Sequence, residues 1–215
     1  EYVSLKRLFG FAMMAGWFFA AVLGPSMEFA VTQFGYRGAY GVWMVLAAIA
    51  ALLVGGVGDG RVLGAPGPRG PLGARLAGLA HISGVILVGL SMMAYFAFVE
   101  RLGQRVGFTL QSVGYLFAAI CGFGALGAGL AGVLGERLGL LGPLVFGTVL
   151  HSIAIVVAVN VANPALFVVG AIGDGFTVMY LLAYQLAAAA ALDATGRWAA
   201  ATSGAFLGAQ ASVPS

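Results

Sequence analysis

The sequence predicts an all-α protein, a polytopic bundle of helices that cross a membrane. Of its 215 residues, 61% are hydrophobic and 8% are charged, whereas about 25% of the residues of a soluble domain are charged. The mean hydropathy is +1.03. The apolar runs are long and continuous, while a membrane β-barrel would show alternating segments of roughly 10 residues. These three observations indicate an integral, multi-pass membrane protein.

One stretch rich in glycine and proline, from Val57 to Arg75, interrupts the apolar sequence. Its prolines would interrupt any helix, and its arginines favour the cytoplasmic side of the membrane. The stretch therefore predicts a cytoplasmic loop over residues 58–75. On one side of it, residues 1–57 have room for two membrane helices. On the other side, residues 76–215 have room for four helices and the start of a fifth.

In the first block, we expect one span to run outward over Phe9–Val31 and a second to return over Ala39–Val57. Gly24 and Pro25 predict a kink in the first span, because proline breaks the helical hydrogen-bond ladder. Glu28 follows one turn later, close to the outer face. It would reach water there by extending its side chain, which is the simplest role for it.

The second block begins with a span that we expect to end before an outer turn, Glu100–Arg105. Asn163 and Pro164 predict another turn, because proline is common at the first position of a helix. The expected spans are Leu76–Val99, Phe108–Leu134, Leu141–Val159, Ala165–Leu192 and a last one from Ala199. Since the chain starts without methionine and ends inside an apolar segment, we expect it to be part of a longer protein.

The basic residues agree with this topology. Seven of the ten fall on the cytoplasmic side and three on the outer side, as the positive-inside rule requires. The inner ones are Lys6, Arg7, Arg61, Arg69, Arg75, Arg137 and Arg197, and the outer ones are Arg37, Arg101 and Arg105. Their scatter over short loops argues against nucleic-acid binding.

Small residues recur in the fourth span at the spacing that brings helices close together. Ala118, Gly122, Ala125 and Gly129 share one face of that span, and we expect another helix to pack there. Cys121 is the only cysteine, so no intrachain disulfide is expected. A thiolate metal site is not expected either.

The run from Gly132 to Gly139, GVLGERLG, resembles the loop signature of the major facilitator superfamily of transporters. That signature reads glycine, any residue, leucine, any residue, acid, arginine, any residue, glycine. In the family it joins helices 2 and 3 and, in weaker form, helices 8 and 9. Leu140 and Leu141 stand where the family usually has basic residues, so we assign the loop to helices 8 and 9. The resemblance implies that Gly132, Glu136, Arg137 and Gly139 form a conformational loop.

With that assignment, nearly the whole chain resembles helices 5 to 11 of the family's twelve-helix fold. Residues 1–57 would be the last two helices of the N-terminal half, and 58–75 the link between the halves. Residues 76–215 would then start the C-terminal half. Gly24 and Pro25 are similar to the end of the family's helix-5 signature. Glu28 and the residue after it replace two further glycines associated with antiporters.

Asp174 is the leading candidate for a functional residue. It lies about ten residues into the sixth span, and an acid within a membrane costs a few kcal/mol or more unless it has a partner. Gln185 returns to almost the same helical angle, and Thr177 and Tyr184 flank that face. The tenth helix of the family lines the substrate cavity. This implies that Asp174 contacts substrate or carries a proton; alternatively, it caps a kink or pairs with a helix outside this chain.

His81 is a second candidate, on the face of the third span that carries Ser91 and Tyr95. The corresponding seventh helix of the family also lines the cavity, although a lone histidine is more often structural. The fifth span resembles a peripheral helix, so we assign His151 no role. We find no nucleophile–base arrangement, no catalytic residue and no metal cluster in the sequence.

These observations predict a secondary active transporter that works by alternating access and exports a small amphipathic or hydrophobic compound in a proton-coupled reaction. Proton-coupled uptake of a small organic solute is the alternative. From another class, the chain would be an intramembrane enzyme or a scaffold subunit. We expect a small-molecule substrate, a lipid bilayer and no nucleic acid as partners, no cofactor, no enzymatic activity, a monomer, and a bacterial inner membrane.

Overall fold

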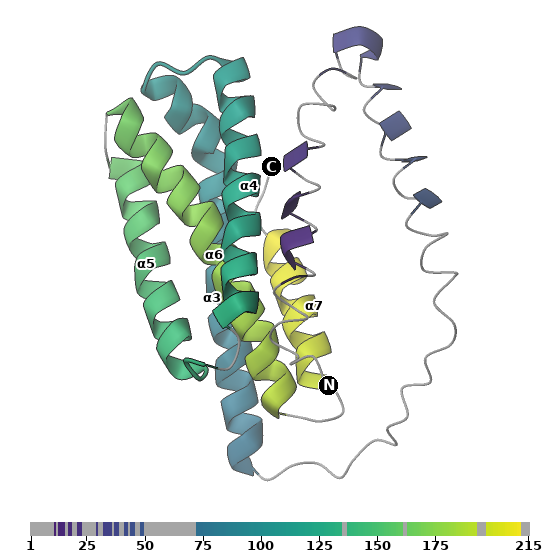
Figure 1. Cartoon of the computed structure of the whole chain (residues 1–215), viewed down its shortest axis with the longest axis vertical. Coiled ribbons are helices and arrows are strands. Elements are labelled where there is room, and N and C mark those ends of the chain that lie inside the picture. The colour runs from purple at the N-terminus through teal and green to yellow at the C-terminus, as the bar shows by residue number, and fades with distance from the viewer. Residues whose placement is uncertain are drawn as a thin grey trace.

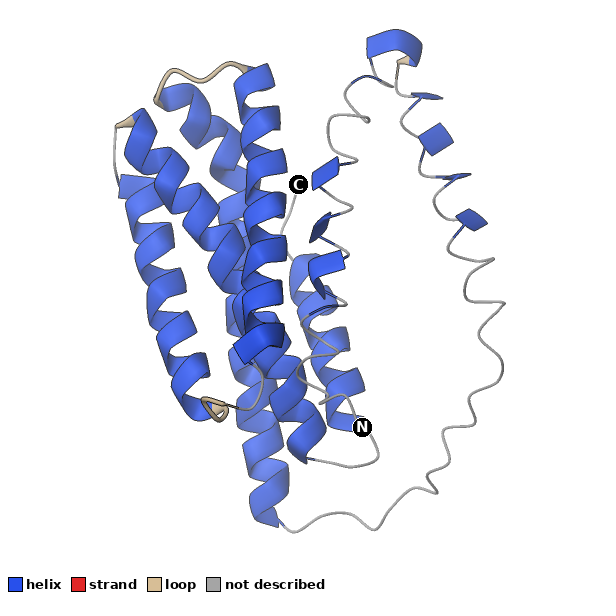
Figure 2. Ribbon diagram, in the orientation of Figure 1, coloured by secondary structure: helices blue, strands red, loops and turns tan. Residues whose placement is uncertain are grey.

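The computed structural model describes residues 72–134, 137–160, 163–192 and 197–211 continuously. The other described positions are 11, 13–15, 17, 18, 21, 22, 29, 32–35, 37, 38, 41, 42, 44, 45, 48 and 49. In this part of the chain all regular structure is helical, and no strand occurs (Figure 2). The helices are α3 (Leu72–Arg105), α4 (Leu110–Leu134), α5 (Leu141–Asn160), α6 (Pro164–Leu192) and α7 (Arg197–Ala211).

Four of these helices, α3 to α6, are long and apolar enough to cross a membrane. They confirm the third to sixth predicted spans and the all-α fold class. The first two predicted spans, with Gly24, Pro25 and Glu28, lie wholly or largely outside the described residues. Many large apolar side chains are exposed around the bundle, among them Leu87 and Leu141. Such a surface suits contact with lipid tails.

Helix α3 is longer than the sequence predicts. It begins at Leu72, inside the predicted loop, and it continues through the predicted outer turn to Arg105. Within that predicted turn, Gln104 Nε2 donates a hydrogen bond to Glu100 Oε1 at 3.2 Å. This pairing of side chains four residues apart supports the helix. Polar residues in this stretch therefore do not mark the end of the helix.

The end of α3 is set by Gly107, whose φ is +91°. Only glycine adopts this left-handed conformation without a steric penalty. Phe108 N donates to Gly103 O at 2.9 Å, and Gly107 N donates to Gln104 O at 3.1 Å. These two bonds form a Schellman motif, which satisfies the last carbonyl groups of the helix.

The starts of α4 and α6 follow from polar caps. Thr109 Oγ1 accepts a hydrogen bond from Ser112 N at 3.2 Å at the start of α4. Asn163 Oδ1 accepts one from Ala165 N at 2.9 Å at the start of α6. Both side chains satisfy amides that have no partner within their own helix. Pro164 is the first residue of α6, so the predicted proline start is confirmed.

Helix α6 is the centre of the bundle. It runs between α4 and α5 in Figure 1 and also contacts α3 and α7. Glycines bring its backbone close to that of α4. A Cβ atom added to Gly175 would lie 2.6 Å from Ile120 O, and one added to Gly127 would collide with Phe176 O. Close backbone approach at small residues is the usual way for membrane helices to associate.

The predicted packing face of α4 is confirmed only in part, because Ala125 and Gly129 are buried but Gly122 is not packed against another helix. Nothing lies within 4 Å of a Cβ atom built on Gly122, and Gly129 faces the side chain of Met14. The face that meets α6 contains Gly124 and Gly127 instead. Both faces repeat small residues at helical spacing, so the sequence alone does not distinguish them.

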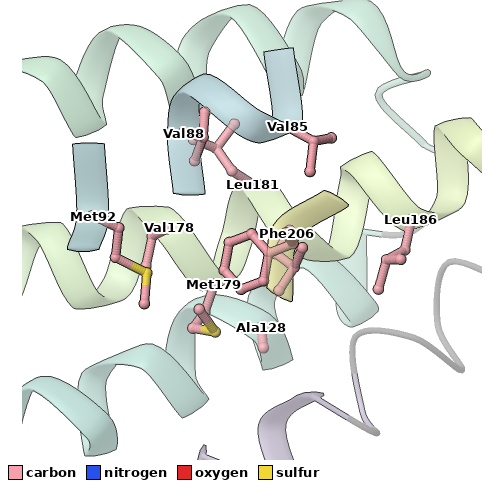
Figure 3. Packing of buried hydrophobic residues seen from close by; sticks show 10 residues of the cluster. Val85, Val88, Met92, Ala128, Val178, Met179, Leu181, Leu186 and Phe206 are labelled. Atoms are coloured by element: carbon pink, nitrogen blue, oxygen red, sulfur yellow. The ribbon is translucent and has the colours of Figure 1, made fainter. Parts of the chain in front are cut away.

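Helices α3 and α7 run parallel to each other. Gly78 lies against Trp198, and Gly89 lies against Phe206 and Ala209, so the offset is 120 residues at both places (198 − 78 and 209 − 89). Phe206 joins a buried apolar cluster with residues of α3, α4 and α6 (Figure 3). The other nine members are Val85, Val88, Met92, Ala128, Val178, Met179, Leu181, Leu182 and Leu186.

The glycine contact between α4 and α6 can be tested with one methyl group. We expect Gly127→Ala to lower the stability of the protein in detergent by about 1 to 3 kcal/mol, the usual cost of overpacking. Gly122→Ala adds the same group to open space on the same helix and should be neutral or slightly stabilising. Thermal unfolding followed by circular dichroism measures both. Equal effects of the two substitutions would contradict the packing described above.

Candidate functional site

Asp174 lies at the centre of the bundle. Its side chain is completely buried, with 0% of its surface exposed. At 1.5 Å per residue, it lies about 15 Å from the Pro164 end of α6. Leu192, at the other end of α6, lies about 27 Å from it, so the carboxylate lies well inside the helix.

His151 of α5 is the closest charged or titratable neighbour that the structure gives Asp174. The imidazole Nδ1 lies 3.1 Å from Asp174 Oδ1, and 3% of the His151 surface is exposed. His151 shares its buried face with Ala154 and Ala158, which lie one and two turns further along α5. This contact was not foreseen from the sequence, which gave α5 a peripheral place; the structure packs this face of α5 onto α6, beside Asp174.

Ser91 of α3 contacts the other nitrogen of the same ring. Its Oγ lies 3.0 Å from His151 Nε2. The same hydroxyl donates a hydrogen bond to Val88 O, one turn back in α3, at 2.8 Å. Ser91, His151 and Asp174 thus form a chain of polar contacts across three helices that are otherwise joined by apolar packing.

The carboxylate of Asp174 has few partners for a buried charge. Neither of its oxygens makes a hydrogen bond to any described residue, and neither does His151 Nδ1. The Nδ1 to Oδ1 distance is short enough for an ion pair, but the two groups are not aligned for a hydrogen bond. A buried polar atom without a hydrogen bond costs about 1 to 3 kcal/mol.

Tyr95 adds a hydroxyl to this cluster. It lies one turn beyond Ser91 on α3, and 3% of its surface is exposed. Tyr95 packs in one buried cluster with Ala171, one turn before Asp174 on α6, and its hydroxyl has no hydrogen-bond partner among the described residues. Tyr95 thus remains a candidate, and the structure brings it together with Asp174.

The order of contacts, serine to histidine to aspartate, matches the order in serine hydrolases. The sequence analysis found no nucleophile–base arrangement, because the three residues come from three helices and meet only in space. Hydrolases also need N–H groups that point at the oxyanion. Ser91, His151 and Asp174 all lie in helix interiors, where backbone N–H groups donate within their own helix.

Thr177 is buried beside Asp174 but directs its hydroxyl to its own helix. Its Oγ1 donates to Gly173 O at 2.7 Å and lies 3.2 Å from Asp174 O. Such a bond is common for threonine inside helices. The predicted polar stripe on α6 is therefore buried, but Thr177 does not present a free hydroxyl to a ligand.

Gln185 and His81 form a second polar level, distinct from Asp174. Eleven residues separate Gln185 from Asp174, which is about 16 Å along the helix. The half-buried ring of His81 lies near the backbone of Gln185, and its Nε2 has no hydrogen-bond partner among the described residues. Thr202 of α7 is fully buried and, by the offset of 120 residues, lies level with Ile82 of α3. The residues that the sequence placed in a single site therefore lie in two groups at different depths along the helices.

The remaining site predictions concern packing and the loop. Tyr184 is buried, and its ring centroid lies 5.0 Å from that of Tyr180, on the side where Ala131 of α4 packs. Gly132 is buried in the last turn of α4, and Arg137 is exposed. Gly139 has a φ of +68°, so the turn favours glycine there. Glu136 lies outside the described residues.

A metal site is a further possibility for a buried carboxylate and a histidine. Among the described residues, however, no group of three His, Cys, Asp or Glu side chains is close enough to hold a metal ion. The cluster around Asp174 offers one carboxylate, one imidazole and two hydroxyl groups, on Ser91 and Tyr95. These groups can bind, hold or transfer a proton without further ligands.

The dependence of Asp174 on His151 can be tested by a double-mutant cycle. We expect His151→Ala to destabilise the protein at pH 7 by about 3 to 5 kcal/mol, because it leaves a buried charge without its partner. In an Asp174→Asn background the same substitution should cost much less, since no charge remains. Chemical unfolding in detergent measures all four proteins. An equal cost in both backgrounds would show that the two residues do not interact.

Comparison with known proteins found no matching family model, no matching curated protein and no matching solved structure. The functional assignment therefore rests on the residues themselves, above all on the buried contacts of Asp174.

Proposed function

We propose that this chain is part of a secondary active transporter that works by alternating access and couples transport to protons at Asp174 and His151. The observation that carries this proposal is the buried contact between His151 of α5 and Asp174, which lies ten residues into the central helix. Acids at this depth are rare and usually serve ion or substrate pathways. A purely structural contact between α5 and α6 would be stable with apolar residues at both positions.

The charges of the pair suggest how a proton could be coupled to movement. With one proton on the pair, the imidazolium and the carboxylate, or their neutral forms, carry no net charge. Without that proton, one negative charge is buried among apolar helices, which is unfavourable. Loading and release of a proton therefore change the stability of the packing around α6, and alternating access requires two such packings.

The resemblance to the major facilitator superfamily supports the same proposal. The predicted order of spans, the glycine-rich loop from Gly132 to Gly139 and the central cytoplasmic stretch fit helices 5 to 11 of that fold. We propose export of a small amphipathic or hydrophobic compound, because the site combines few polar groups with a largely apolar bundle. Uptake of a small organic solute would use the same proton site, and the direction of transport distinguishes the two.

Hydrolysis is the second candidate function, and the Ser91, His151 and Asp174 contacts favour it specifically. A fluorophosphonate probe reacts with a serine only where a base activates it. Under the transporter proposal, we expect no labelling of Ser91 in the purified protein. Labelling that disappears in Ser91→Ala and in His151→Ala would instead establish an intramembrane hydrolase.

The proposal can be tested by transport into proteoliposomes of the complete protein, with ethidium as an amphipathic probe. We expect an imposed proton gradient to drive ethidium accumulation, and Asp174→Asn to reduce this at least tenfold. Exchange of ethidium without a gradient should persist in that variant, because it requires no proton transfer. Glu100→Gln is the matched control, since Glu100 is exposed and bonded only to Gln104 in the described part of the chain. Unchanged gradient-driven transport in Asp174→Asn would refute the proposal.

A further inference from the structure

We infer that Ser91 is a positioning residue that fixes the tautomer of His151, so that His151 and Asp174 together bind one proton. This inference deepens the proposed function, because it concerns the same proton site. It rests on three distances that join Val88, Ser91, His151 and Asp174 in one line of contacts.

The first step is to establish which acceptor receives the single hydrogen of the Ser91 hydroxyl. Two acceptors compete for it, Val88 O at 2.8 Å and His151 Nε2 at 3.0 Å. Serine in a helix commonly donates to a carbonyl three or four residues back, and here that carbonyl is also the nearer acceptor. Ser91 then presents only lone pairs to His151, so Nε2 must carry the hydrogen of their bond.

The second step follows from the chemistry of imidazole. A neutral ring carries one hydrogen, and with that hydrogen on Nε2 the other nitrogen has a bare lone pair. This bare Nδ1 would lie 3.1 Å from Asp174 Oδ1, where two electron-rich atoms repel each other. One added proton removes the repulsion. It binds either to Nδ1, which gives an imidazolium beside a carboxylate, or to Asp174, which gives a neutral acid.

The third step is that no other described charge compensates for the loss of this proton. Tyr95 is the remaining titratable group of α3 at this level. Helix α4 contains no Asp, Glu, Lys or Arg, and its titratable groups are Tyr115 and Cys121. The only charged residue of α7 is Arg197, at its first position. The pair therefore alternates between net charges of zero and −1, with the proton taken from and returned to water.

Nitrogen-15 NMR of histidine tests the tautomer directly on the purified complete protein in detergent. His81→Gln leaves His151 as the only histidine of these 215 residues, and His151→Asn in the same background identifies its signals among those of the complete protein. As the pH is raised, we expect Nδ1 to change from a protonated to a bare nitrogen, while Nε2 stays protonated throughout. The opposite outcome, a bare Nε2 and a protonated Nδ1, would overturn the inference. It would also be the orientation in which His151 can act as a base toward Ser91.

Substitution of Ser91 tests its positioning role. In Ser91→Ala, Nε2 loses its acceptor, and the hydrogen of the neutral ring can move to Nδ1 and stabilise the Asp174 carboxylate. We expect mixed tautomers and a titration midpoint about one pH unit lower, a tenfold weaker proton affinity. Ser91→Thr retains the hydroxyl and should restore the midpoint and the single tautomer. An unchanged spectrum in Ser91→Ala would show that Ser91 does not position the ring.

These spectra need no transport activity, so the inference and the proposed function can fail separately. A protonated Nε2 together with unaffected ethidium transport in Asp174→Asn would leave a real proton site without a role in transport. Loss of gradient-driven transport in Asp174→Asn, together with a bare Nε2 on His151, would support proton coupling. It would refute the role of Ser91.

Discussion

The close approach of α6 to its neighbours is the constraint on which the rest of this structure depends. In a membrane, apolar side chains gain little from leaving lipid, so helices associate where small residues let their backbones touch. Gly127 and Gly175 provide such contacts between α4 and α6. On the opposite side, Gly170 lies against Ala158 of α5. Because this part of α6 is enclosed, Asp174, with 0% of its surface exposed, is removed from both lipid and water.

That enclosure explains why Asp174 is so dependent on its neighbours. A carboxylate facing a water-filled cavity would need no partner, whereas one with no exposed surface must share a proton or a counter-charge. His151 is the neighbour placed to share the proton, and Ser91 and Tyr95 complete a cluster made by three helices. A site shared among helices responds to any movement of one helix relative to another. This property suits a transporter more directly than a scaffold.

The same cluster also explains why its chemistry is ambiguous from residue types alone. Serine, histidine and aspartate in contact are the parts of a hydrolase, but they are also the parts of a proton relay. The distinction lies in the direction of one hydrogen. If Ser91 donates to a carbonyl of its own helix, Nε2 of His151 carries the ring hydrogen. Nδ1 is then left to exchange a proton with Asp174. If Ser91 donates to His151, the hydroxyl becomes a nucleophile, although the backbone N–H groups of Ser91, His151 and Asp174 lie in helix interiors and are not free to bind an oxyanion.

The sequence by itself determined the fold class, the four described spans and the exceptional position of Asp174, because hydropathy and charge act locally along the chain. It did not determine which face of α4 meets α6, since two faces carry small residues at equivalent spacing. It also gave no sign that His151 would meet Asp174, or that Gln185 and His81 would lie at a separate level. Those relations join different helices, and only the tertiary structure decides them, because side-chain contacts across a bundle depend on the rotation and depth of each helix.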